Sequence, residues 1–267
     1  MLADVLCLRS QPLMLAPLVL AVVLTGCYDP GYQLDSADEP VAAQQQTWDS
    51  QDGNPTHATH SYMSEFALDQ LKGWYPQLQQ YRAQIVDGSN RELHELPVSD
   101  PEQEALRVAV GGTNWACDRP AILWDDARAA YSSGDRAKAW WYVGIVLHFV
   151  QDMGAPAHAF HVVHQASVSQ MDNFEFLALQ RWAPYYDANR SDPVLASPAD
   201  YIEFGGAWTV EDFQQAFPGK AYTRTMFATS WLWAPTAQKN FVRNRQGRGA
   251  LATQWALLAA VAGFARL

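Results

Sequence analysis

Apolar positions recur at near-helical spacing along most of the chain after residue 55. The first such face comprises Tyr62, Phe66, Leu68, Leu71 and Trp74. A second segment follows at 78–86, and the same spacing predicts further helices over 120–131, 136–153, 174–186, 210–217, 221–233 and 249–266. Strand-like alternation of apolar and polar residues is rare, so the pattern predicts an all-α fold.

One predicted helix, over residues 136–153, is apolar on nearly every side. Trp140, Val143 and Leu147 are among its apolar residues, and Asp135 stands where an N-cap residue is expected. The sequence after it, from Gly154 to Pro156, favours a helix end. A helix that is apolar all round is buried, so we expect this segment to be the central helix of the fold.

The N-terminal segment has the features of an export signal. An apolar run from Leu13 to Leu24 leads into Thr25, Gly26 and Cys27, which resembles the bacterial lipobox. This predicts a signal peptide over 1–26, a lipid on Cys27, a flexible tether over 27–47 and one helical domain over 48–267. The alternative is an ordinary secretory signal with an incidental cysteine. Because Tyr28 rather than Asp follows the cysteine, we expect attachment to the outer membrane of the cell envelope.

Composition and charge narrow the classes of function. Hydrophobic residues make up 49% of the chain, which is enough for one sizeable core. The net charge of -10 argues against broad binding to nucleic acid, because an acidic surface repels phosphate. With Cys7 in the signal and Cys27 lipidated, Cys117 is alone, so no disulfide is expected within the chain. We expect a monomer.

Histidines cluster near the end of the predicted central helix. Four of the seven lie between 148 and 164. His148 and Asp152 are four residues apart, which places an imidazole and a carboxylate on one helix face. A divalent metal would satisfy both groups, and a buried hydrogen bond between them is the alternative. A turn at the Gly154 break would bring His158 back toward them, whereas His161 and His164 fit surface positions better.

Two motifs carry a resemblance to a known family. The segment from Leu147 to His158, with its His-x-x-x-Asp-x5-His spacing, resembles the core of the zinc-dependent phospholipase C and single-strand nuclease superfamily. Upstream, the segment from Trp48 to His57 is similar to the mature start of the bacterial phospholipases C. The resemblance covers about residues 48–190. It implies a single helical bundle of the phospholipase C type, built around a metal cluster of up to three zinc ions.

The resemblance also implies a set of metal ligands. Asp152 would bridge two ions, one of them shared with His148, and His158 would bind another. The complete implied set is His57, His148, Asp152, His158 and Glu175, together with the main chain of Trp48 and, less directly, His94.

The chain departs from the family pattern at several positions. Met171 stands where the family has a histidine four residues before the glutamate. The family also has an aspartate and a histidine upstream of the central helix. Here His94 is the histidine of that region, with Asp87 and Glu92 as nearby carboxylates. Asp87 or Glu92 could act as general base, and exposed surface charge is the alternative for all three.

Taken together, these features lead to one leading expectation and two alternatives. The leading one is a zinc-dependent phosphodiester hydrolase of the phospholipase C kind, which uses a metal-activated water on a phospholipid or another phosphodiester. The lipid on Cys27 would hold it at a membrane. The alternatives are a nuclease of the same superfamily, and a non-enzymatic lipoprotein that keeps the fold with a degenerate site.

Overall fold

The protein is helical throughout the part that its computed structural model describes, which comprises residues 59–90, 115–160, 162, 172–185 and 195–267. These residues form helices and turns and no strand, so the all-α prediction is confirmed for them. None of their helices is long and apolar enough to cross a lipid bilayer. The elements are α2 (Thr59–Leu71), η2 (Pro76–Tyr81), α3 (Arg82–Ser89), α5 (Trp115–Ser132), α6 (Arg136–Asp152), α7 (Pro156–Ala159), α8 (Asn173–Leu179), η4 (Pro198–Asp200), α9 (Tyr201–Ala216) and α10 (Thr236–Phe264).

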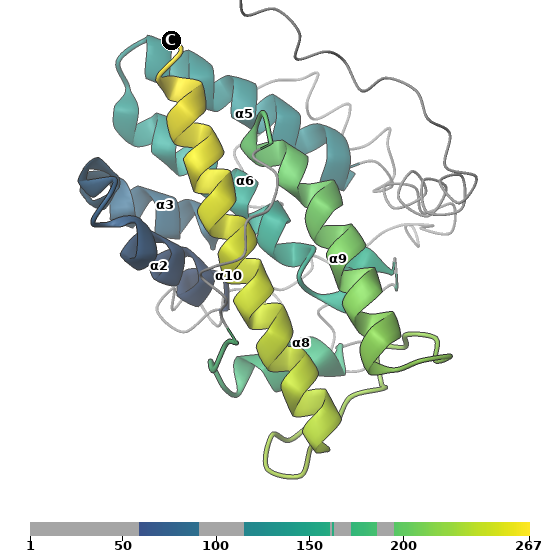
Figure 1. Ribbon diagram of the computed structural model, residues 1–267. Helices are drawn as coiled ribbons and strands as arrows, with labels where there is room; N and C mark the ends of the chain where they lie inside the picture. The colour runs from purple at the N-terminus through teal and green to yellow at the C-terminus, as the bar shows by residue number, and fades with distance from the viewer. Residues whose placement is uncertain (1–58, 91–114, 161, 163–171, 186–194) are drawn as a thin grey trace, which may run out of the picture.

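Helix α6 is the central helix, as its sequence predicts. It packs on α3, α5, α9 and α10, and most of its residues from Val143 to Gln151 are fully buried. Asp135 caps its N-terminus by accepting a hydrogen bond from the Lys138 backbone N–H at 3.1 Å. Figure 1 shows α6 in the middle of the molecule, with α2 and α3 on one side, α9 on the other and α10 running along the bundle.

Helices α3 and α6 touch through a pair of glycines. A Cβ added at Gly88 would lie 2.3 Å from the Trp141 carbonyl oxygen, and one at Gly144 would lie 2.4 Å from the Ile85 carbonyl oxygen. No side chain fits in either place, so only glycine permits the two backbones to approach this closely. The contact brings the end of α3, at Ser89, against the part of α6 that carries His148.

The apolar core falls into two clusters, which meet at the C-terminal end of α6. One contains Trp140, Leu147 and Met153, and the other contains Ala155 together with an aromatic group from α8, α9 and α10. Asp152 lies at their boundary. The C-terminal end of α6, which carries His148 and Asp152, is therefore surrounded by packed side chains on both sides.

Helices α8, α9 and α10 differ most from the limits that the sequence predicts. Helix α8 ends at Leu179 rather than 186, because the side-chain amide of Gln246 takes the carbonyls of Ala178 and Arg181. Helix α9 begins at Tyr201, before the expected 210, and keeps Gly205 helical, where an added Cβ would lie 3.3 Å from the Met153 Cβ. Helix α10 begins at Thr236, before the expected 249, in a polar stretch whose side chains serve tertiary contacts.

The helix predicted over 221–233 is wrong, because these residues form turns. Several of their backbone groups bond to side-chain amides from neighbouring helices, beside turn bonds such as that from the Met226 N–H to the Thr223 carbonyl. Gln238 of α10 accepts from the Ala228 N–H and donates to the Met226 carbonyl. Asn173 of α8 donates to the Phe227 carbonyl at 2.8 Å. Tertiary partners thus replace the helical hydrogen bonds that the local sequence predicts.

Candidate metal centre

His148 and Asp152 lie on one face of α6, as their spacing predicts. His148 Nε2 is 3.3 Å from Asp152 Oδ2. The imidazole is almost completely buried, with 2% of its surface exposed, and the carboxylate is 14% exposed. The helix therefore presents a carboxylate at the edge of the core with one imidazole already against it.

The second histidine at this carboxylate is His60, which the sequence reasoning missed. It is the second residue of α2, is completely buried, and places its Nε2 3.3 Å from Asp152 Oδ1. The two imidazole rings stack with centroids 4.4 Å apart and an angle of 21° between their planes. His60, His148 and Asp152 each offer one ligand atom, and these atoms all lie within 4.8 Å of one another.

The protonation of both imidazoles follows from what their Nδ1 atoms contact. His148 Nδ1 lies 3.2 Å from the Ser89 carbonyl oxygen, which can only accept, so Nδ1 carries the proton. His60 Nδ1 lies 2.6 Å from the side-chain oxygen of Gln151, which is also an acceptor. In their neutral forms both rings therefore keep the lone pair on Nε2, the atom that faces Asp152.

The orientation of the Gln151 amide is set by two hydroxyl groups that donate their own protons to other acceptors. Gln151 Nε2 donates to Ser64 Oγ at 2.8 Å and to Thr253 Oγ1 at 3.2 Å. Ser64 Oγ donates to Ser89 Oγ, which donates to the Val86 carbonyl. The Thr253 hydroxyl donates to the carbonyl of Gly249, one helical turn earlier. Both series of hydrogen bonds end on backbone carbonyls, so Gln151 Nε2 must be the donor to the two hydroxyls. The Gln151 side-chain oxygen therefore points at His60.

The resulting arrangement sets two imidazole nitrogens against one carboxylate. Each Nε2 lies 3.3 Å from one carboxylate oxygen, and either a proton on Nε2 or a cation between the groups would satisfy this arrangement. The distance exceeds that of a charge-assisted hydrogen bond, which is about 2.7–2.9 Å. It matches the edge of a tetrahedron around zinc, which is roughly 3.4 Å for zinc–ligand bonds near 2.1 Å. The donor set therefore fits a divalent metal.

The charge of Asp152 suits the same role. Burial alone would raise the pKa of this carboxyl, but the charges of His148, His158 and His60 in their protonated forms, with a hydrogen bond from His60, more than offset burial and hold its pKa well below the ordinary value of 3.8. The carboxylate is thus anionic at neutral pH, which is the state that binds a cation.

A second histidine–carboxylate pair adjoins the first. After α6 ends, Ala155 is extended and Pro156 begins α7, which brings His158 back toward α6 as its spacing predicts. His158 Nε2 lies 3.9 Å from Asp152 Oδ1 and 3.5 Å from Glu175 Oε1. The His158 side chain is 31% exposed, whereas His60 is fully buried. His60, His148, Asp152, His158 and Glu175, here called the histidine group, are therefore accessible to solvent on the His158 side.

Glu175 is held by the start of α8. Asp172 caps this helix by accepting from the backbone N–H groups of Phe174 and Glu175. The Tyr222 hydroxyl donates to the Asp172 carboxylate at 2.7 Å. Burial, and then the charges of Asp172 and Glu175, raise the pKa of Tyr222 well above 10.0, so its hydroxyl keeps the proton that it donates. Glu175 itself is 4% exposed.

The remaining predicted site residues are placed differently or lie outside the described residues. Asp87 is on α3, and its carboxylate accepts a hydrogen bond from the Trp141 indole at 2.8 Å. Its role as general base stays a prediction. Trp48, His57, Glu92 and His94 lie outside the described residues, as does Cys27 with the rest of the segments 1–26 and 27–47.

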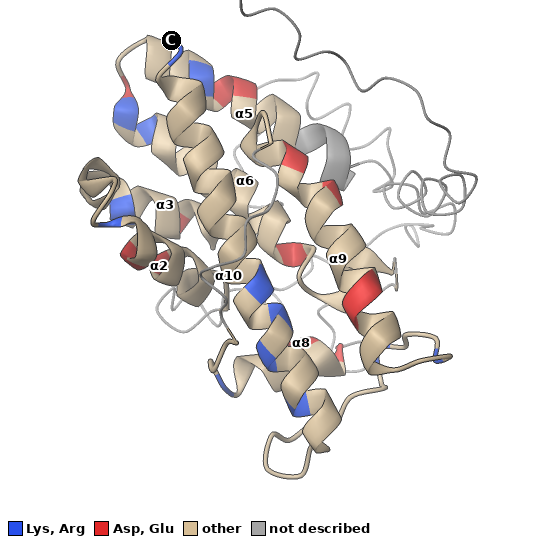
Figure 2. Ribbon diagram, in the orientation of Figure 1, with Lys and Arg blue, Asp and Glu red and all other residues tan. Residues whose placement is uncertain are grey.

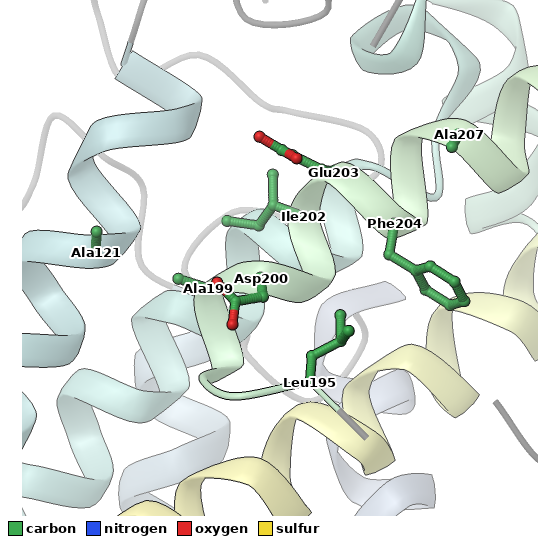
Figure 3. Close-up of a pocket in the computed structure, with 8 residues that line it drawn as sticks. All are labelled: Ala121, Leu195, Ala199, Asp200, Ile202, Glu203, Phe204 and Ala207. Atoms are coloured by element: carbon green, nitrogen blue, oxygen red, sulfur yellow. The ribbon is translucent and has the colours of Figure 1, made fainter. Parts of the chain in front are cut away.

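One pocket among the described residues lies away from His60, His148 and Asp152. It lies between α5 and α9, and Figure 3 shows its lining, which includes Leu195, Ile202, Phe204 and the acidic Asp200 and Glu203. Asp200 is already engaged there in capping, since it accepts from the Ser197 backbone N–H at 2.9 Å. None of the described lining residues belongs to the histidine group.

No family model, curated protein or solved structure matches this chain. The resemblance to the phospholipase C and nuclease superfamily accordingly rests on the two sequence motifs and remains a prediction.

Proposed function

We propose that the protein binds zinc between His60, His148 and Asp152 and uses it to hydrolyse phosphodiesters. The observation that carries this proposal is the convergence of His60, His148 and Asp152, whose three ligand atoms all lie within 4.8 Å of one another. Imidazole and carboxylate donors suit zinc. Two imidazoles and one carboxylate also suit Fe(II). The adjoining His158 and Glu175 pair, linked to the first through Asp152, favours a site for more than one zinc ion.

Each residue of the site would have its own role in the proposed reaction. Bound zinc would acidify a water molecule to a pKa near 7 and neutralise charge on the phosphoryl oxygens. His60 and His148, locked through Gln151 and Ser89, would hold their ligand atoms in fixed positions. Asp152 offers one oxygen to each of two sides, so it would set the spacing of neighbouring ions. His158 is the most exposed member and would mark the side at which substrate enters.

Among phosphodiesters, the proposal favours phospholipids over nucleic acids. The lipobox-like segment ending at Cys27 would place the protein at a membrane. The net charge of -10 disfavours a polyanion of extended length. The histidine and carboxylate motif is also the one whose sequence resembles the phospholipase C type.

Metal analysis combined with turnover assays tests this proposal. The purified full chain should contain zinc and hydrolyse a phosphocholine diester, and a chelator should abolish turnover until zinc is restored. The same preparations are assayed with single-stranded DNA. Turnover of DNA alone would assign a nuclease, and bound zinc without turnover of either substrate would assign a metal-binding protein without this activity. Bound iron in place of zinc would overturn the zinc assignment.

A further inference from the structure

The last part of the chain has the opposite charge to the whole. Residues 213–267 contain seven Lys or Arg and no Asp or Glu, although the net charge of the chain is -10. Four of the seven lie in the first half of α10, and Lys220 and Arg224 lie in the segment before it. Figure 2 shows the blue segments of α10 gathered in one half of that helix. Arg245 and Arg248 pair with Asp212, so the cations left for an outside partner at this cationic end are Lys220, Arg224, Lys239 and Arg243.

Large apolar side chains are exposed at the same end. Leu232 is 72% exposed and Trp233 is 79% exposed, just before α10 begins at Thr236. Tyr185 is 48% exposed and lies under the Arg243 guanidinium, 3.8 Å from ring centroid to cation. Of the large apolar residues that are exposed in the described part of the chain, most lie at this end. Apolar exposure of this size next to cations marks a contact surface.

The loop that carries Leu232 and Trp233 is fixed in position. Gln180, at the end of α8, accepts from the Trp231 backbone N–H at 2.8 Å and donates to the Thr229 carbonyl at 2.9 Å. Ala234 is buried and closes the other side of the turn. Leu232 and Trp233 are therefore held outward by a backbone that is anchored on both sides, so their exposure is a property of the fold.

We propose that this cationic end docks on an anionic lipid surface, with Leu232 and Trp233 inserted among the head groups. Tryptophan favours the membrane–water interface, where its ring is half buried and its N–H stays hydrated. Lys239 and Arg243, one and two turns into α10, lie beside the exposed turn that carries Leu232 and Trp233, here called the tip, and would bind lipid phosphates. Arg181 approaches the ring of the neighbouring Trp231 at 5.9 Å. Each cation near an anionic bilayer strengthens binding by roughly fivefold.

This docking does not depend on metal binding, but it would orient the candidate metal centre. Gln180, which holds the tip, and Glu175, which contacts His158, belong to the same short stretch of α8 and its C-cap. The rise along a helix between them is about 7.5 Å. A membrane bound at the tip would thus lie near the histidine group, which gives the proposed phosphodiesterase access to head groups.

Vesicle co-sedimentation tests the proposal. The full chain with Cys27→Ser, which prevents lipidation, is mixed with phosphatidylcholine vesicles containing roughly one third phosphatidylglycerol, with and without EDTA. We expect binding that is equal in both conditions and is lost on pure phosphatidylcholine. Adding Leu232→Ser and Trp233→Ser should weaken binding at least about tenfold. The matched control is Trp74→Ser, since Trp74 is 84% exposed but lies outside this region.

The possible outcomes separate the proposals. Equal binding by the Leu232→Ser, Trp233→Ser variant and its parent overturns the docking site, as does an equal loss in the Trp74→Ser variant. Retention of single-stranded DNA in place of vesicles would assign the cationic end to nucleic acid and also overturns it. Binding that survives EDTA in a protein without phosphodiesterase activity would support docking while the proposed function fails.

Discussion

Two buried polar clusters lie next to each other in this fold and differ in how the charge of their carboxylate is balanced. In one, Arg245 of α10 donates to Asp212 and to Thr209 of α9 and to the Gly154 carbonyl, so each nitrogen of the guanidinium meets an acceptor. In the other, His60 and His148 turn their Nε2 atoms toward the Asp152 carboxylate, and all three residues offer ligand atoms to a metal. The first group contains its own permanent cation, and the second could take one from outside.

This difference separates a structural role from a binding role. Burial lowers the pKa of Arg245 to about 10, with Asp212 opposing the shift, so the guanidinium stays charged at neutral pH. Arg245 and Thr209 also hold the carbonyls of Gly154 and Met153, which form the turn between Asp152 and His158. The self-contained cluster thereby supports the geometry of the one that is open to a metal. The following predictions test that contrast.

Loss of Arg245 should have the largest effect on stability. Arg245→Met leaves Asp212 buried without its main cation, so the free energy of unfolding should fall by about 3–5 kcal/mol. Because this cluster does not bind metal, urea unfolding should show the same loss with zinc and with chelator. Arg248→Gln is the matched control, since Arg248 contacts the same carboxylate but is 21% exposed, and it should cost less than about 1 kcal/mol. A loss in Arg245→Met that differs between zinc and chelator would show that the Arg245 cluster is not independent of metal binding.

Loss of Asp152 should act mainly through metal. At a zinc concentration about a thousandfold above Kd, the parent protein should gain about 4 kcal/mol of stability over its chelated form. Asp152→Asn should gain almost none and should purify with less zinc. In chelator, the parent should keep only the smaller advantage in stability that its ionised carboxylate gives at neutral pH. Unchanged zinc content in Asp152→Asn would remove the bridging role of this carboxylate.

Loss of Gln151 should weaken metal binding without removing it. Gln151→Leu frees the His60 ring to change orientation and tautomer, so zinc affinity should fall about 10–100-fold, as measured by competition with a chromophoric chelator. Gln246→Leu is the control, because Gln246 is an equally buried glutamine that bonds to the Ala178 and Arg181 carbonyls. It should lower stability and leave zinc affinity unchanged. Equal zinc affinities in the two variants would show that Gln151 does not position His60.

The smallest effect should appear on acidification of the metal-free protein. The pKa of Asp152 is lowered in the folded state, so its stabilising contribution is complete above the ordinary value of 3.8 and is lost as pH falls through the lowered value. Between about pH 5 and about pH 3 the parent should therefore lose more stability than Asp152→Asn, which has no carboxylate to protonate. Urea midpoints measured across this range should converge, and parallel curves would contradict the depressed pKa.

The sequence predicted local features of the fold well and long-range ones poorly. Helix α6, its Asp135 cap and the break at Gly154 follow from periodicity and from residues that act on their own neighbours. The early starts of α9 and α10 did not, because both regions are rich in glycine or polar residues that α6 and α8 use as partners. The turns over 221–233 likewise depend on Gln180, Gln238 and Asn173, which lie in other helices.

The candidate site shows the same division. His148 and Asp152 share a face because a helix repeats every 3.6 residues, and His158 returns because a proline begins a new helix after the turn; both follow from the sequence by itself. The tertiary structure alone decided that His60, 92 positions before Asp152 in the chain, completes the group and that Gln151 fixes its tautomer. Local backbone geometry has a short range, whereas the close contact of α3 with α6 and the packing of α2 beside them depend on the whole core.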